Sequence, residues 1–369
     1  MKVISVFGTR PEAIKMAPLV QELAIHPQIE SKIVVTAQHR EMLDQVLELF
    51  RLKPDYDLNI MRHGQTISGI TAAVISGLED ILTREKPDLV LVHGDTTTTF
   101  AASLAAFYQR IPCGHIEAGL RTDNKYSPYP EEVNRRLTSI LADYHFAPTL
   151  GAQKNLLREN ISPEYIAVTG NTVIDALLQV VEKPCSLANL GLDDVNWQKR
   201  VILLTCHRRE SWGEPMKRVF SAVKEIKNRY PDLEIVFPVH KNPKVRELAY
   251  GILGNIKGIH LCEPLDYLPF CHVMNKSFLV LTDSGGMQEE APALGKPVLV
   301  LREVTERPEA VTAGTACLLG TDKENIIKNL TLLLDNPAEY NKMAKAVNPF
   351  GNGTASQQIV EKICQWMNV

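Results

Sequence analysis

The chain has 369 residues, 45% of them hydrophobic and 22% charged, and its 40 Lys and Arg against 43 Asp and Glu leave a formal net charge of −3. At ~150 residues per domain, this length predicts two or three domains with a large buried core. The balanced charge excludes a broad basic footprint for nucleic acid, although it leaves room for a local basic site. The apolar runs reach only about seven residues, far below the ~20 that cross a bilayer, so no membrane partner is expected.

Cysteine usage and the first residues both favour a cytoplasmic location. The seven cysteines are an odd number, they are scattered, and none forms a C-x-x-C pair. A disulfide framework or a zinc cage is therefore not expected, and a reducing compartment fits better. The opening segment MKVISVFGTR has no apolar stretch followed by a small-residue cleavage site. We predict that it forms a first strand and not a signal peptide.

Short β-branched runs alternate with longer amphipathic stretches in the first half of the chain. The predicted strands are 2–8, 32–37, 89–95, 113–118, 144–148 and 166–170. A capping box with Pro11 in the first turn predicts a helix that starts after Thr9, and Pro18 should kink or restart this helix. A further helix is expected over about 130–141.

The second half repeats this rhythm. The predicted strands are 200–206, 234–240, 259–264, 278–284 and 297–302, with helices between them such as 215–229 and 322–335. Strands that are apolar almost throughout, each followed by a helix, indicate a parallel sheet covered on both faces. We therefore predict an α/β chain of two Rossmann-like, doubly wound parallel-sheet domains with a cleft between them. The domains are expected at 1–183 and 184–353, joined around 182–199, and a C-terminal helix within 354–369 can return to pack on the first domain.

Polar groups gather where five predicted strands end. The segments are Gly8-Thr9-Arg10, His93-Gly94-Asp95, His115-Ile116-Glu117, His207-Arg208-Arg209-Glu210 and Asp283-Ser284-Gly285-Gly286. In an open parallel sheet, ligands bind beyond the carboxyl ends of the strands. Each segment alone is more often a helix cap or a loop salt bridge, but the five together favour a ligand-binding cleft.

Segment 282–290 has the pattern of a strand, a glycine turn and a helix. This pattern suits a diphosphate, because glycines let a ligand approach the backbone and the helix start offers free N–H groups. Glu289 or Glu290 can accept hydrogen bonds from ribose hydroxyls, although a plain glycine turn is an equally good interpretation. Arg10 and Lys15 can neutralise phosphate or be solvated helix charges. Neither G-x-G-x-x-G nor G-x-x-x-x-G-K-[ST] is present, so neither a nicotinamide cofactor nor a P-loop ATPase is expected.

No metal site is expected. His115 and Glu117 lack the Pro-Cys-x-x-Cys partner of zinc deaminases, and His207 with Glu210 has no second histidine at a useful spacing. No G-x-S-x-G elbow supports a serine hydrolase. Phe270 can stack on a base, but an aromatic residue at helical spacing is more often part of the core.

From residue 1 to about 355, a series of motifs occurs in order and with few gaps. They are FGTRPEAIKMAPL, TAQHREMLDQVL, HGDTTTT, GHIEAGLRT, SPYPEE, TGNTVIDAL, HRRES, LTDSGGMQEEAP and TERPEAVTAGT. Together they resemble the non-hydrolysing UDP-N-acetylglucosamine 2-epimerases of bacteria. The resemblance implies a glycosyltransferase-B-like fold, a homodimer without a cofactor, and interconversion of UDP-N-acetylglucosamine with UDP-N-acetylmannosamine for surface polysaccharides such as capsule.

The reaction implied by the resemblance eliminates UDP across C1 and C2 of the sugar. It gives a bound 2-acetamidoglucal, and UDP adds back after a proton returns to the other face of C2. The C2 proton has no carbonyl beside it in the ring, so simple deprotonation gives no stabilised anion. The route needs acid and base groups near C2, charge stabilisation for the departing UDP, and exclusion of water.

The resemblance assigns the catalytic roles to Asp95, Glu117, Glu131 and His207. Two faces of C2 must exchange protons, so at least two of the three acids are expected to act as opposing bases, and the sequence leaves open which. His207 is expected to stabilise or protonate the departing UDP. The implied nucleotide contacts are Arg10, Lys15, Leu265 through its backbone, Phe270, Ser284, Gly285, Gly286, Glu290 and Arg307.

Bacterial members of this family are activated by a second UDP-N-acetylglucosamine bound beside the substrate. The matching positions here are Gln38, Glu41, Gly64, Glu131, Arg208 and His240. Relatives from Gram-positive bacteria carry Gln in place of Glu41 and Arg in place of Gly64. Arg62 or His63 nearby can therefore take the part of that Arg.

Three other functions are compatible with this architecture. A glycosyltransferase would need a groove for a sugar acceptor, and a hydrolysing epimerase would admit water to the glucal and release free N-acetylmannosamine. A non-catalytic nucleotide-sugar sensor would keep the glycine turn and Phe270 but would not need three acids at one sugar. Fold alone does not separate these functions, and the three acids with the HRRE segment favour epimerisation.

Overall fold

The computed structural model describes residues 1–37, 40–60 and 64–368, with the backbone alone at 40 and 41. The chain divides into two compact units. The first unit is Met1–Ala176 with Phe350–Val369, and the second is Leu177–Pro349. The chain therefore crosses between the units twice, after residue 176 and after residue 349, where the expected domain limits were 183 and 353.

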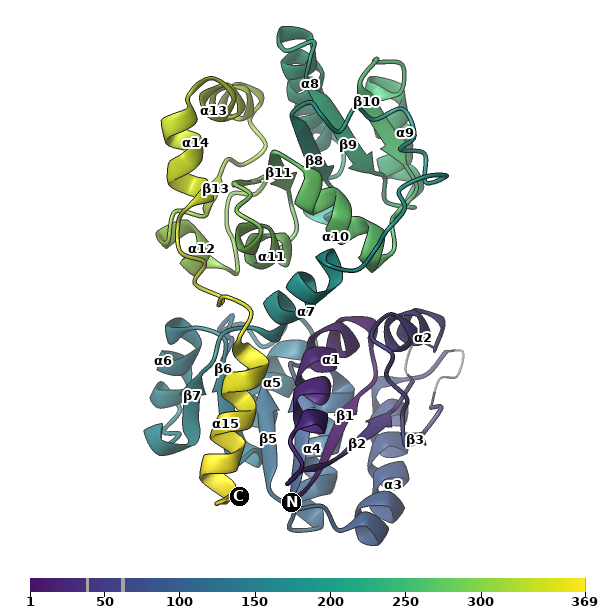
Figure 1. Cartoon of the computed structure of the whole chain (residues 1–369), viewed down its shortest axis with the longest axis vertical. Coiled ribbons are helices and arrows are strands. Elements are labelled where there is room, and N and C mark those ends of the chain that lie inside the picture. The colour runs from purple at the N-terminus through teal and green to yellow at the C-terminus, as the bar shows by residue number, and fades with distance from the viewer. Residues whose placement is uncertain (38–39, 61–63, 369) are drawn as a thin grey trace. The chain divides into compact units, whose positions relative to one another are not determined.

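The first unit is built on a seven-stranded sheet in the order β3-β2-β1-β4-β5-β6-β7, with parallel pairing throughout. Its strands are β1 Lys2–Phe7, β2 Glu30–Val35, β3 Tyr56–Asp57, β4 Leu89–His93, β5 Cys113–Ile116, β6 Tyr144–Ala147 and β7 Ile166–Val168. Its helices are α1 Arg10–Ile25, α2 Arg40–Leu49, α3 Ile67–Glu85, α4 Thr97–Tyr108, α5 Glu131–Leu141, α6 Leu150–Arg158 and α15 Ala355–Met367, and α7 Thr172–Val181 leads into the second unit. Helices α1 and α15 lie side by side on one face of the sheet, and α3, α4 and α5 lie on the other (Figure 1). The strand order reverses between β1 and β4, so the loops after these strands flank the position where such sheets bind ligands.

The second unit is built on a six-stranded parallel sheet in the order β10-β9-β8-β11-β12-β13. Its strands are β8 Val201–Thr205, β9 Glu234–Pro238, β10 Ile259–Cys262, β11 Leu279–Thr282, β12 Val298–Val300 and β13 Ala316–Leu318. Its helices are α8 Glu214–Arg229, α9 Pro243–Leu253, α10 Tyr267–Lys276, α11 Met287–Ala293, α12 Pro308–Thr312, α13 Lys323–Asp335 and α14 Pro337–Ala344. The predicted fold class, two doubly wound α/β domains with parallel sheets, is confirmed.

Helix α1 begins where the sequence predicts, but it continues through Pro18. Thr9 caps the helix, and the capping box between Thr9 and Glu12 is present. Pro18 lies inside the helix without ending it, so the expected restart at this position is wrong. Pro18 is buried together with the apolar face of the helix, and this burial offsets the hydrogen bond that a proline removes.

The core of the second unit shows why its helices form where they do. Met216, Phe220, Val223 and Ile226 recur at helical spacing along α8, and all are buried. Phe220 packs against Phe237 of β9 with ring centroids 5.5 Å apart. Each such side chain contributes about 1.5 to 3 kcal/mol by leaving water. Helix α8 is therefore fixed on the sheet by its apolar face.

The C-terminal segment belongs structurally to the first unit. The carboxylate of Asp175 accepts hydrogen bonds from the main-chain N–H groups of Ala355 and Ser356 at 3.2 and 2.8 Å. Further along α15, Trp366 stacks on Tyr144 with ring centroids 4.9 Å apart. Within the described chain, no helix combines the length and the apolar character that crossing a membrane requires.

Candidate active site

Helix α5 begins with Glu131 and contacts Asp95 at the carboxyl edge of the first sheet. Asp95 lies just after β4, and Glu131 is the first residue of α5. From the same helix, Arg135 pairs with the Asp95 carboxylate at 2.6 Å, and Asn134 Nδ2 donates to the Asp95 main-chain oxygen at 3.0 Å. Glu131 Oε2 is buried and has no hydrogen-bond partner within residues 1–37, 40–60 and 64–368. A buried carboxylate oxygen without a partner is unusual, and this marks Glu131 as a candidate functional group.

Glu117 follows β5 directly and adopts a left-handed backbone, with a φ of 61°. A residue with a Cβ pays about 1 to 3 kcal/mol for such a conformation, so surrounding contacts must hold it. The Glu117 carboxylate forms an ion pair with Lys15 and accepts a hydrogen bond from Asn171 Nδ2 at 2.7 Å. His93 Nε2 lies 3.9 Å from the same carboxylate oxygen. Glu117 Oε1 lies 3.8 Å from the position that a Cβ on Gly94 would take. The Glu117 side chain therefore borders the loop after β4.

A buried carboxylate, Glu12, clamps the loop after β1 to the start of α4. It accepts hydrogen bonds from the main-chain N–H of Thr9 at 2.8 Å and from the hydroxyls of Thr96 and Thr99 at 2.7 and 3.1 Å. Burial raises the pKa of Glu12, and the hydrogen bonds oppose that rise. The clamp fixes the two loops that flank the reversal of strand order.

In the second unit, a buried acid holds His207. Both main-chain N–H groups of His207 and Arg208 donate to Asp283 Oδ2, at 2.7 and 2.8 Å, and His207 Nδ1 lies 3.0 Å from Oδ1. Burial alone would raise the pKa of Asp283, but these contacts with His207 and Arg208 lower it below its ordinary value. The His207 ring stacks on His240 at a centroid distance of 5.9 Å. Burial, followed by the charge of His207, lowers the pKa of His240.

Arg302 ties the HRRE segment to the loop after β12. Its side chain is buried, Nε pairs with Glu210 at 2.8 Å, and Nη1 pairs with Glu306 at 2.6 Å. Glu306 also lies 3.8 Å from Arg208. Burial tends to raise the pKa of Glu306, but the hydrogen bonds and charge of Arg302 lower it to about 2. Arg302 ends the predicted strand 297–302, and the sequence pattern does not reveal its pairing with Glu210 and Glu306.

The glycine turn and the acids of α11 lie together. Gly285 and Gly286 separate β11 from α11. Glu290 Oε1 lies 3.3 Å from the position that a Cβ on Gly286 would take. Arg307, at the start of α12, forms an ion pair with Glu289 of α11. A carboxylate therefore borders the turn, and a guanidinium is held against the same helix.

The predicted site residues fall into two groups, one in each unit. The first unit contains Arg10, Lys15, Asp95, Glu117 and Glu131; the second contains His207, Arg208, His240, Leu265, Phe270, Ser284, Gly285, Gly286, Glu290 and Arg307. Leu265 and Phe270 are both half-buried. Leu265 precedes Asp266, the N-cap of α10, and Phe270 lies in the first turn of that helix. Gln38 lies outside the described residues, as do Arg62 and His63 and the side chain of Glu41.

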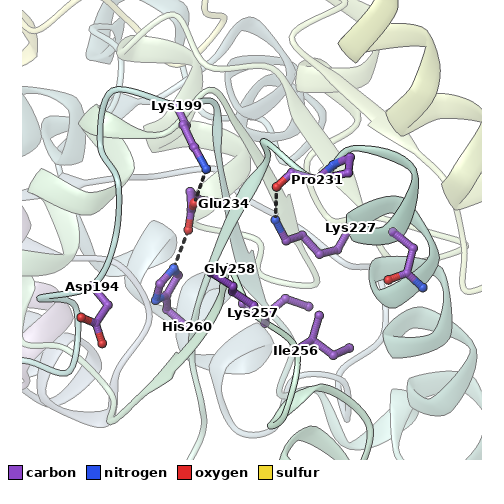
Figure 2. A pocket seen from close by; sticks show the side chains of 11 residues that line it. Asp194, Lys199, Lys227, Pro231, Glu234, Ile256, Lys257, Gly258 and His260 are labelled. Carbon is purple, nitrogen blue, oxygen red and sulfur yellow. Dashed lines mark hydrogen bonds and ion pairs between the residues drawn. The ribbon is translucent and has the colours of Figure 1, made fainter.

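A cavity of about 800 Å³ lies elsewhere in the second unit, at the amino ends of β8, β9 and β10. Figure 2 shows three of its charged side chains, Lys199, Glu234 and Lys227, in contact with neighbours. Glu234 bridges His260 Nε2 at 2.6 Å and Lys199 Nζ at 3.2 Å, and Lys227 Nζ donates to the Pro231 oxygen at 2.7 Å (Figure 2). These contacts engage Lys199, Glu234, His260 and Lys227 within the second unit, and none of the predicted site residues lines this cavity. Across the described residues, no three His, Cys, Asp or Glu side chains are grouped to hold a metal ion.

Comparison with solved structures places the fold in the glycosyltransferase-B-like class. The glycosyltransferase of kitacinnamycin is 11% identical, with a TM-score of 0.65 over 98% of each chain, which shows the fold alone. Much closer is the UDP-N-acetylglucosamine 2-epimerase from Neisseria meningitidis, solved bound to UDP-N-acetylglucosamine. It is 55% identical, with a TM-score of 0.87 over 99% of this chain and 100% of that chain.

Sequence comparison gives the family. A family model described as UDP-N-acetylglucosamine 2-epimerase matches residues 21–364. The Escherichia coli K12 protein of that name is 57% identical over 98% of both chains, and the Bacillus subtilis one is 56% identical over 98% of this chain and 95% of its own. The chain belongs to the UDP-N-acetylglucosamine 2-epimerase family, whose members are isomerases, and the resemblance seen in the sequence is confirmed.

Proposed function

We propose that this chain interconverts UDP-N-acetylglucosamine and UDP-N-acetylmannosamine by inverting C2, and that the product serves surface polysaccharide synthesis. The observation that carries the proposal is the set of carboxylates at one sheet edge. Asp95 and Glu131 are joined through α5, and Glu117 borders the loop after β4. The relative from Neisseria meningitidis, solved with UDP-N-acetylglucosamine, supports this substrate.

The proposed chemistry uses the carboxylates as proton carriers. One carboxylate removes the proton from C2, the C1–oxygen bond to the β-phosphate breaks, and a C1–C2 double bond forms. A second acid returns a proton to the opposite face of C2, and the UDP oxygen adds back to C1. Proton transfer by such positioned groups contributes roughly 10²- to 10⁴-fold in rate.

The second unit supplies groups suited to the departing UDP. His207 Nδ1 faces Asp283, so Nε2 is the ring nitrogen proposed to face a phosphate oxygen, to which it donates when both ring nitrogens carry a proton. Ser284, Gly285 and Gly286 offer an open turn, and Glu290 borders it as a ribose acceptor. In the first unit, Arg10 and Lys15 are proposed to balance phosphate charge.

One NMR sample tests the reaction. The protein is incubated with UDP-N-acetylglucosamine in D₂O, without any sugar acceptor. We expect deuterium at C2 together with a manno product. An unchanged spectrum would contradict the proposal and favour a transferase or a sensor, and net release of free hexosamine would favour a hydrolysing epimerase.

A second UDP-N-acetylglucosamine bound as activator stays a prediction, as do the homodimer and the cytoplasmic location. Arg208 and His240 support the first of these, because both lie beside His207 and present donors to a second diphosphate. We expect the initial rate with UDP-N-acetylmannosamine alone to be low and to rise when a trace of UDP-N-acetylglucosamine is added. A full rate without this addition would argue against activation.

A further inference from the structure

Asn171 contacts the Glu117 carboxylate from a part of the chain 54 residues away. It lies between β7 and α7 and is 2% exposed. Its Nδ2 donates to Glu117 Oε2 at 2.7 Å, and its Oδ1 accepts from the main-chain N–H of Val173 at 3.1 Å. Since the oxygen of the amide is committed to α7, the nitrogen must face Glu117, and the amide cannot turn over without losing both bonds.

We propose that Asn171 is a positioning residue that fixes the Glu117 carboxylate for proton transfer at C2. The proposal rests on the function proposed above. Three other groups face this carboxylate: Lys15 from α1, His93 from β4, and the backbone at Gly94. Lys15 is also a proposed phosphate ligand, so a bound nucleotide competes for its ammonium group. Asn171 is an uncharged donor that is not among the proposed phosphate ligands, so a bound nucleotide is not expected to draw it away from Glu117.

The backbone of Asn171 is anchored where the chain returns to the first unit. Its N–H donates to the Phe350 oxygen at 2.7 Å. Gly170 has a φ of 84°, and a Cβ there would lie 3.0 Å from that oxygen and 3.2 Å from Gly351 Cα, so only glycine fits this close crossing. Asn171, and through it the Glu117 carboxylate, is therefore held in place by the packing of Phe350 and Gly351 against Gly170.

Two substitutions separate the positioning role from the fold. Asn171→Ser keeps an oxygen to cap α7 but removes the Nδ2 group that donates to Glu117. We expect kcat to fall about 10- to 100-fold, as for a misplaced catalytic group, with KM and UDP affinity changed less than about twofold. Asn336→Ser is the matched control, because Asn336 caps α14 through Ala338 and Glu339 in the second unit. It should leave kcat unchanged.

Asn171→Asp tests the same contact through charge. It keeps the size and the cap but sets a carboxylate against Glu117, which raises the pKa of Glu117. Because a base must be ionised to act, the fall of kcat at low pH should move upward by about one unit or more. The carboxyl ¹³C resonance of Glu117 in the ligand-free protein should titrate at a correspondingly higher pH.

The outcomes distinguish this inference from the proposed function. If the wild-type protein epimerises and N171S and N171D keep its kcat and pH profile, Asn171 has no positioning role. If the wild type shows no epimerisation, the proposed function fails, and the Glu117 resonance still decides whether Asn171 controls this carboxylate. An unmoved resonance in folded N171D overturns the inference in either case.

Discussion

Glu117→Gln and Asp95→Asn are each expected to reduce deuterium exchange at C2 by about 10³-fold, because an amide cannot accept the proton that a carboxylate removes. UDP affinity should stay within a few fold, since the proposed UDP contacts lie mainly in the second unit. Exchange is measured by NMR in D₂O, and UDP binding by calorimetry. The two measurements together separate loss of chemistry from loss of binding.

The pairing of each acid sharpens this prediction. Asp95→Asn also leaves Arg135 without its ion-pair partner at 2.6 Å, and Glu117→Gln removes the partner of Lys15. Asp123→Asn is the matched control, because Asp123 is an exposed acid of the same unit whose side chain pairs with Arg136 at 2.8 Å. Normal exchange in both site variants would rule out their roles. Loss of exchange in the control would indicate a general structural effect.

The sheets were predictable because each strand carries its own local pattern. Apolar runs followed by amphipathic stretches identify all the longer strands of both units, and the capping box at Thr9 identifies the start of α1. Strands β3 and β13, each at the edge of its sheet, are absent from the prediction. Strand β3 has only two residues, too few for a periodic pattern of its own. Strand β13 has three residues, the same length as the predicted strands β7 and β12, so its length alone does not explain the omission.

The sequence predicts which polar residues follow the strands, but it does not predict which residues contact one another around them. Glu12 meets Thr96 across 84 residues and Asn171 meets Glu117 across 54, so no local spacing reveals either pair. The left-handed backbone of Glu117 is equally invisible, because no residue preference marks a glutamate for that conformation. The choice of Asp95, Glu117 and Glu131 as catalytic acids stays a prediction, and the tertiary structure adds the groups that contact the first two of them.

Acidification from pH 6.5 to pH 4 is expected to destabilise the first unit strongly. Three of its buried histidines bind a proton less readily in the folded protein than in the unfolded chain. His93, His115 and His145 are at most 3% exposed. Burial lowers the pKa of His93 and His145 to about 4 and of His115 to about 3, in each case as the largest cause. In the unfolded chain a histidine has a pKa near 6.5, so between these values the unfolded state binds more protons. Stability is therefore lost as the pH falls, by about 3 kcal/mol for each histidine by the time the pH reaches 4.

Urea unfolding at several pH values between 7 and 4.5 measures this loss, and His145→Gln isolates one histidine. Glu12 and Asp175 have pKa values raised by burial and act in the opposite direction, so the informative quantity is the difference in slope between variant and wild type. Removing one such histidine should reduce the slope by about 1.4 kcal/mol per pH unit within the window from 6.5 to 4. His115→Gln should do the same, although it also loses the 2.7 Å contact with the Gly94 oxygen and so starts from a lower stability at pH 7. A variant that is destabilised equally at every pH would show that burial does not lower the pKa of that histidine in the folded protein, which contradicts the prediction.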